Sequence, residues 1–227
     1  MQKFFTKDTA RVVEAYIGEY ASGKSEISIN RALNLKNQGR LVTLVDLDTV
    51  EPFYTLRPLK RQLESQGLNV IGLSQEDSFG LGETGAMLTP RARWALMNEG
   101  DIILDIGYGV NGARTLNLVE GAYESPELKI FAVVNYSRPM TNSQDRIKEY
   151  VLSMGRVDAI IANTHLADET TVEIIKKGNQ EIIEAARDLG IPVEAMVVEE
   201  RLYPQIVKEG LDIPVRIIRR YMPAAMW

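Results

Sequence analysis

The stretch GEYASGKSEI, residues 18–27, places two glycines five positions apart and follows the second with a lysine and a serine. This is the spacing of the phosphate-binding loop G-x-x-x-x-G-K-[ST], in which glycines let the backbone curl around an anion and the lysine neutralises its charge. An apolar run from Val12 to Ile17 precedes the loop, and a segment of helical period follows it. A strand, a loop and a helix in this order would direct backbone N–H groups and the helix N-terminus at a phosphate group.

Length and composition limit the classes of protein to which the chain can belong. It has 227 residues, 45% of them apolar and 25% charged, with no cysteine and one histidine, His165. These values predict a single globular domain over residues 1–227 and exclude disulfides, thiolate ligands and histidine-rich metal sites. A net charge of -5 with both signs interspersed disfavours nucleic acid as a partner. The sequence shows neither a signal peptide nor an apolar run near the roughly 20 residues of a membrane span, so we expect a cytoplasmic protein without membrane insertion.

Short runs rich in valine and isoleucine alternate along the chain with longer segments of helical period. This alternation predicts a doubly wound α/β fold of the P-loop NTPase type, a mostly parallel sheet with helices on both faces. Thr141 and Asp168 are the predicted N-caps of two helices, and the polar stretch 75–87 is a predicted surface loop. The predicted strands are 11–18, 40–48, 68–74, 101–107, 128–136, 157–163 and 191–198, and the predicted helices are 25–38, 88–100, 141–154 and 168–190, with Gly39, Gly100, Gly155 and Gly190 at helix ends.

Acidic residues stand at the ends of two predicted strands, where a parallel sheet gathers its ligands. Asp46 and Asp48 end the strand LVTLVDLD, and Asp105 lies in IILDIG just before Gly107. In a P-loop protein the lysine contacts the β- and γ-phosphates, the serine hydroxyl binds Mg²⁺, and strand-end acids hold the metal and orient the attacking water. We therefore expect Lys24, Asp46, Asp48 and Asp105 to be catalytic, Ser25, Asp46 and Asp105 to bind the metal, and Gly107 to let the chain turn close to the γ-phosphate.

Two further glycine patterns, GLGETG (80–85) and GYGVNG (107–112), match the dinucleotide fingerprint G-x-G-x-x-G. That fingerprint must open a βαβ unit directly after its strand, with an acidic residue about 20 positions later. The first match is separated from its strand, and the second follows the fourth predicted strand. Both patterns are weak support for NAD binding.

Several segments in order resemble one known family. GEYASGKSEISINRAL, LVDLDTVEPFYTLR, ILDIGYGVNGAR, VVNYSRPMTNS and IANTHLADETT followed by DLGIPV are similar to uncharacterised members of the CobQ/CobB/MinD/ParA nucleotide-binding superfamily, the deviant branch of P-loop ATPases. The resemblance implies ATP and Mg²⁺ as ligands and slow hydrolysis that switches conformation or partner. It implies that Asn163 contacts the base, although a strand-end turn or helix-cap role for Asn163 stays open. The cofactor-binding residues are then Gly18, Tyr20, Ala21, Ser22, Gly23, Lys24, Ser25, Glu26, Gly107 and Asn163.

Two positions depart from the pattern of that superfamily. Glu19 stands where dimerising members carry a signature lysine that reaches the nucleotide of the partner subunit, so a homodimer would form without that nucleotide sandwich. Leu166 stands where guanine-specific relatives have an aspartate, which favours ATP over GTP. Arg114 and Arg138 could approach a phosphate or be surface groups.

These observations lead to one function and two alternatives. We expect a Mg²⁺-dependent ATP-binding protein with slow ATPase activity, acting as a molecular switch toward a protein partner. An ATP-dependent ligase or small-molecule kinase on the same scaffold is the first alternative, with Arg91 and Arg93 meeting an anionic substrate. A module that binds nucleotide without hydrolysing it is the second.

Overall fold

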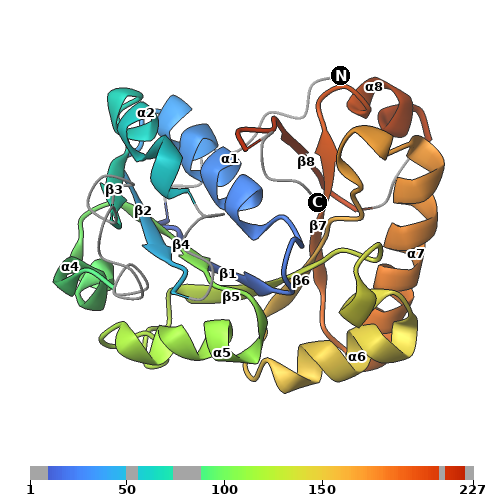
Figure 1. The fold of residues 1–227 in the computed structure, drawn as a ribbon, viewed down its shortest axis with the longest axis horizontal. Coiled ribbons are helices and arrows are strands. Elements are labelled where there is room, and N and C mark those ends of the chain that lie inside the picture. The colour runs from blue at the N-terminus through green and yellow to red at the C-terminus, as the bar shows by residue number, and fades with distance from the viewer. Residues whose placement is uncertain (1–9, 50–55, 74–87, 210–212, 223–227) are drawn as a thin grey trace.

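Eight strands form one parallel sheet in the part of the chain that the structure describes (Figure 1). The computed structural model describes residues 10–49, 56–73, 88–209 and 213–222. The strand order is β3-β2-β4-β1-β5-β6-β7-β8, so β1 lies inside the sheet between β4 and β5. The strands are β1 (Val13–Gly18), β2 (Val42–Leu47), β3 (Asn69–Ile71), β4 (Asp101–Ile106), β5 (Leu128–Val134), β6 (Ala159–Ala162), β7 (Val193–Glu199) and β8 (Val215–Ile218).

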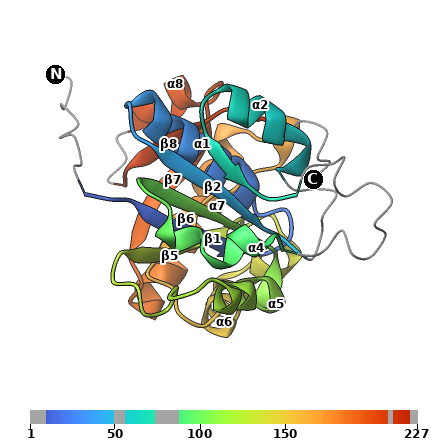
Figure 2. The same ribbon diagram turned by 90° about the vertical axis from the view of Figure 1, so that its left-hand side faces the viewer.

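Helices cover both faces of this sheet, as the side view in Figure 2 shows. One face carries α1 (Lys24–Asn37), η1 (Arg57–Leu59) and α2 (Lys60–Ser65). The other carries α4 (Pro90–Arg93), α5 (Gly109–Ala113), α6 (Gln144–Ser153) and α7 (Val172–Leu189). The remaining helices are α8 (Tyr203–Ile206) and the short 3₁₀ helices η3 (Ala95–Met97), η4 (Arg114–Leu118), η5 (Pro139–Thr141), η6 (Ala167–Glu169) and η7 (Val207–Glu209).

The apolar strands explain the two layers of helices. In β4, Ile102 and Leu104 pack into the core shared with α5 and α6, while Ile103 packs into the core shared with α1. Successive side chains of a strand point to opposite faces, so a strand that is apolar throughout needs a cover on both sides. The predicted doubly wound α/β fold is therefore confirmed.

The boundaries of several elements differ from the predictions. All seven predicted strands are present, but β8 was missed because IPVRIIRR intersperses its apolar residues with arginines. The predicted helix 88–100 is wrong as one helix, since Trp94 leaves helical geometry between α4 and η3. The predicted loop 75–87 lies outside the described residues. Within the described ranges, no helix combines the length and apolar character that crossing a membrane requires.

The two predicted N-caps are also wrong by two or three residues. Ser143, not Thr141, caps α6, and Thr171, not Asp168, caps α7, each accepting a hydrogen bond from the backbone N–H three residues on. Thr141 instead lies in η5, and its hydroxyl donates to Asn135 O. Because serine, threonine and aspartate are all good caps, sequence order alone does not choose among neighbouring candidates.

Candidate functional site

The loop between β1 and α1 has the geometry of a phosphate cradle. β1 ends at Gly18 and α1 begins at Lys24, so the intervening residues 19–23 turn from the sheet into the helix. The Ser22 N–H donates to Glu19 O at 3.2 Å, and Gly23 takes the left-handed conformation with φ 93°. The first turn of α1 therefore starts directly after a curled loop, where its N–H groups and dipole favour an anion.

Lys24 folds back over this loop. Its Nζ donates to Glu19 O at 2.9 Å, and the side chain is buried. Burial lowers the pKa of Lys24, while the carboxylates of Asp105, Asp48 and Glu19 act in the opposite direction. A buried ammonium group between a loop of backbone amides and a group of carboxylates is placed to balance phosphate charge.

Asp105 is the acid best suited to a metal among the three that the sequence predicts. It pairs in register with Asp46 of the neighbouring strand, its Oδ1 accepts from Ser28 Oγ at 3.3 Å, and Ser25 lies near enough to lower its pKa. Its Oδ2 is buried and has no hydrogen-bond partner. Burial raises the pKa of Asp105 to about 7, with the neighbouring carboxylates of Asp46 and Asp48 acting in the same direction. An unpartnered buried oxygen next to the P-loop serine fits a magnesium ligand.

Asp46 is engaged within the protein on both oxygens. Its Oδ1 accepts from Asp48 N at 2.9 Å, and its Oδ2 accepts from Arg57 Nε at 3.0 Å. Burial raises the pKa of Asp46 to about 6, against the effect of Arg57. Asp46 thus holds the backbone of Asp48 in place. A carboxylate oxygen has two lone pairs, so these bonds do not by themselves bar Asp46 from binding a metal.

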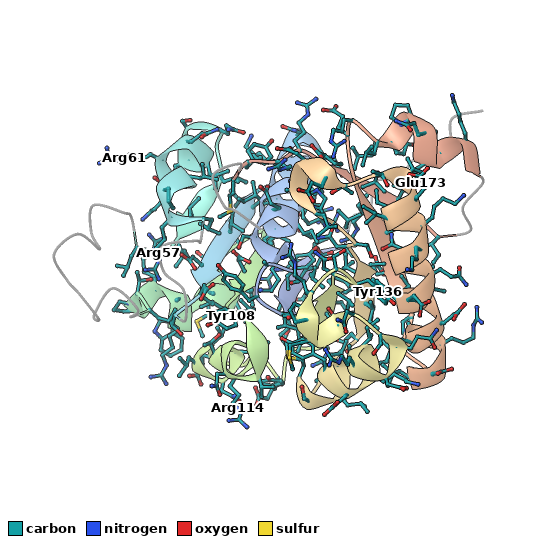
Figure 3. All side chains as sticks on the ribbon, turned by 45° about the vertical axis from the view of Figure 1, so that its right-hand side comes forward. Arg57, Arg61, Tyr108, Arg114, Tyr136 and Glu173 are labelled. Atoms are coloured by element: carbon teal, nitrogen blue, oxygen red, sulfur yellow. The ribbon has the colours of Figure 1, made fainter. Side chains whose placement is uncertain are left out.

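Arg57 is a site residue that the sequence did not reveal. Its side chain is only 3% exposed, and its Nη2 also donates to Asp48 O at 2.9 Å. Figure 3 shows it beside β2, whereas Arg61 and Arg114 project from the outer surface. A lone arginine in TLRPL gives no sequence signal, because its partners Asp46 and Asp48 lie nine to eleven residues earlier in the chain.

Asn163 fastens the P-loop to the end of β6. Its Nδ2 donates to Ser22 O at 2.7 Å, a contact that neither a base-binding role nor a turn role anticipates. Glu19 fastens the loop to η5, since its carboxylate accepts from Met140 N at 3.0 Å and from Thr141 Oγ1 at 3.1 Å. The loop is therefore held by Asn163 from the end of β6 and by η5 through Glu19.

The remaining predicted residues lie around the loop. Tyr20 is exposed and meets Tyr108 edge to face, with ring centroids 5.2 Å apart. The carboxylate of Glu26 accepts from the backbone N–H groups of Tyr221 and Met222, so its side chain holds the C-terminal segment. Gly107 follows β4 directly. Its carbonyl packs closely on Gly112, and a Cβ added to Gly112 would lie 2.0 Å from Gly107 O.

The other polar groups considered from the sequence are at the surface or in turns. Arg93 pairs with Glu120 at 2.9 Å and lies over the Trp94 ring, and Arg114 is exposed. His165 accepts from Ala167 N at 3.0 Å, which gives it a turn role, and burial lowers its pKa. Within the described ranges no three acidic or histidine side chains form a metal cluster. A magnesium ion at Ser25 and Asp105 would therefore also need oxygens from bound phosphates, as this metal commonly does.

Replacing Gly23 with alanine tests the cradle. The left-handed backbone disfavours any Cβ by about 1–2 kcal/mol, and here the added Cβ would also lie 2.3 Å from Asn163 Nδ2. We expect Gly23→Ala to weaken binding of inorganic tripolyphosphate at least tenfold, measured by calorimetry. Gly39→Ala is the matched control, because Gly39 has φ 81° but nothing within 4 Å of the added Cβ. Equal tripolyphosphate binding by both variants would contradict the importance of this contact.

Comparison with known proteins supports the fold. By sequence, the chain matches no protein-family model and no curated protein. By structure, it is similar to FtsY of Thermotoga maritima, a cell division protein (18% identity, TM-score 0.52, covering 83% of this chain and 62% of that one). It is also similar to the signal recognition particle receptor FtsY of Elizabethkingia anophelis in complex with GDP (15% identity, TM-score 0.54, covering 87% and 60%).

FtsY of Mycoplasma mycoides gives a comparable match (13% identity, TM-score 0.53, covering 85% and 61%). The chain thus spans about three fifths of the length of these proteins. At such identities the likeness establishes architecture and leaves ligand and partner open. The chain has the P-loop NTPase fold.

Proposed function

We propose that this chain is a Mg²⁺-dependent ATP-binding protein that hydrolyses ATP slowly and acts as a molecular switch toward a protein partner. The proposal is carried by one juxtaposition: Ser25 and the unpartnered Oδ2 of Asp105 lie together beside the curled loop and its buried lysine. An oxyanion and a divalent cation are the two ligands that would satisfy these groups together.

Each residue of the site would have a separate task. The loop amides and Lys24 would hold the phosphates, and Ser25 with Asp105 would hold the metal. Mg²⁺ would supply neutralisation of phosphate charge and a fixed orientation of the phosphate oxygens. Asp48, fixed through Asp46 and Arg57, would orient the attacking water.

The finer assignments are also proposals. We propose that residues 1–227 form a single domain of the MinD/ParA-like branch, and that the protein works in the cytoplasm. ATP is preferred to GTP in this proposal because Leu166 offers no carboxylate to a guanine amino group. If the chain forms a homodimer, we propose that no lysine from one subunit reaches the nucleotide of the other. Glu19 stands at that position, and its carboxylate is engaged with Met140 and Thr141 of its own chain.

Calorimetric titration with ATP and Mg²⁺ tests this function. We expect a saturable heat that disappears when EDTA removes the metal, and a slow release of phosphate that does not rise with added metabolites. GTP in place of ATP is expected to bind at least tenfold more weakly. A folded protein that binds neither ATP·Mg²⁺ nor GTP·Mg²⁺ at millimolar concentration would rule the function out.

A further inference from the structure

The segment that follows β8 is fixed to the first turns of the P-loop helix. Glu26 accepts from Tyr221 N at 2.9 Å and from Met222 N at 2.7 Å. One turn further along α1, Asn30 pairs with the backbone of Arg219 in both directions, accepting from its N–H at 2.9 Å and donating to its carbonyl at 2.8 Å. The segment is therefore held by side chains from the first two turns of α1.

Between these anchors lies Arg220, which adjoins the P-loop. It lines a small cavity together with Ala21 and Gly23 of the loop and with Asn163 and His165 from the end of β6. Glu26, Asn135 and Ile218 complete the lining. The cavity thus adjoins the loop on the side of β6, and it is walled in part by a segment nearly 200 residues away in sequence.

This cavity has room for about one water molecule. Its volume is about 20 Å³, and a single water needs roughly 10–15 Å³ by the same measure. A purine ring is several times larger, so a side chain of the wall must move before a base can enter.

Arg220 is the wall residue that can move at little cost. Its side chain is 17% exposed and its guanidinium pairs with Asp168, whose side chain is 89% exposed. Ion pairs with so exposed a partner contribute little, because water and salt compete for both groups. The backbone on either side stays fixed by Asn30 and Glu26, so the guanidinium can leave Asp168 while its Cα remains in place.

We propose that Arg220 is a nucleobase-contacting residue: it leaves Asp168 when nucleotide binds and lays its planar guanidinium against the base. A guanidinium stacks on aromatic rings and donates to ring nitrogens and carbonyls, so it suits a purine. The proposal rests on the proposed function, because it needs the phosphates to lie in the loop. The phosphate cradle and the base contact are nevertheless separate, and they can be tested separately.

The experiment compares a ligand that has a base with one that has none. ATP·Mg²⁺ and tripolyphosphate·Mg²⁺ are titrated into the wild type, Arg220→Ala and Arg220→Lys. We expect both substitutions to weaken ATP binding at least tenfold and to change tripolyphosphate binding less than twofold. Lysine keeps the positive charge but lacks the planar guanidinium that stacks on a base. Arg219→Ala is the matched control, because the Arg219 side chain pairs with Glu200 at the surface, and it should leave both affinities unchanged.

The outcomes separate the two ideas. If the wild type binds neither ligand, the proposed function itself fails. If tripolyphosphate binds and Arg220→Ala leaves ATP affinity unchanged or raises it, the base contact is wrong. Equal weakening of both ligands by Arg220→Ala would place the guanidinium at the phosphates and would also overturn it. Circular dichroism of each variant checks that the fold is kept.

Discussion

Replacing Lys24 with alanine is expected to weaken binding of ATP·Mg²⁺ at least 100-fold, which corresponds to about 2.7 kcal/mol. The ammonium group is buried against the loop and donates to Glu19 O. A phosphate in the cradle would replace this bond to a neutral carbonyl with bonds to negatively charged oxygens, in which both partners carry charge. Tripolyphosphate should lose affinity by a similar factor, because the lysine contacts phosphate oxygens and not the base.

Lys60→Ala is the matched control for this variant. Lys60 Nζ donates to a backbone carbonyl, that of Gly72, at 2.8 Å, so the bond removed is of the same kind. It lies at the start of α2. We expect Lys60→Ala to bind ATP·Mg²⁺ like the wild type in calorimetry. Lys24→Ala with affinity within threefold of the wild type would show that the loop does not hold the phosphates.

Local pattern was enough to predict the centre of this site. Glycine spacing and an apolar run placed the loop between β1 and α1, and strand-end acids placed Asp46 beside Asp105, which the structure pairs in register. Both rules depend on residues close in sequence and on the parallel arrangement of neighbouring strands. The fold class follows from the same alternation of strands and helices.

Contacts between distant segments were not predictable in this way. Glu26 reads as part of a phosphate loop, but its carboxylate binds backbone N–H groups 195 and 196 residues later. Asn163 reads as a turn or base-binding residue, yet it donates to Ser22 O across 141 residues. Every residue type except proline offers the same backbone N–H and C=O groups. The identity of the partner residue therefore does not reveal these bonds in a single sequence.

The acid at the centre of the site should lower the stability of the free protein. We expect Asp105→Asn to raise the free energy of unfolding of the ligand-free protein by about 1–3 kcal/mol at pH 8, and to abolish the Mg²⁺-dependent gain in ATP affinity. Burial disfavours the ionised carboxylate, and its Oδ2 has no partner in the folded chain. An amide of the same shape carries no charge to bury.

The stability difference between Asp105→Asn and the wild type should grow as the pH rises. The pKa of Asp105 is raised to about 7 in the folded protein, against about 3.9 in an unfolded chain. Between these values the folded state binds more protons than the unfolded state, so this group makes stability fall as pH rises. Urea unfolding of Asp105→Asn and wild type should therefore differ little at pH 4.5 and most at pH 8.

Asp101→Asn is the control that separates this effect from carboxylate removal in general. Asp101 lies on the same strand and is equally buried, but Oδ1 accepts from Val12 N at 2.9 Å and both oxygens accept from Arg40. Removing one partner of a buried ion pair costs about 3–5 kcal/mol, so Asp101→Asn should unfold at lower urea. If the change in unfolding free energy is positive for Asp105→Asn and negative for Asp101→Asn, then Asp105 is the buried aspartate whose partner is a ligand. Destabilisation by Asp105→Asn at pH 8 would instead assign it a structural role.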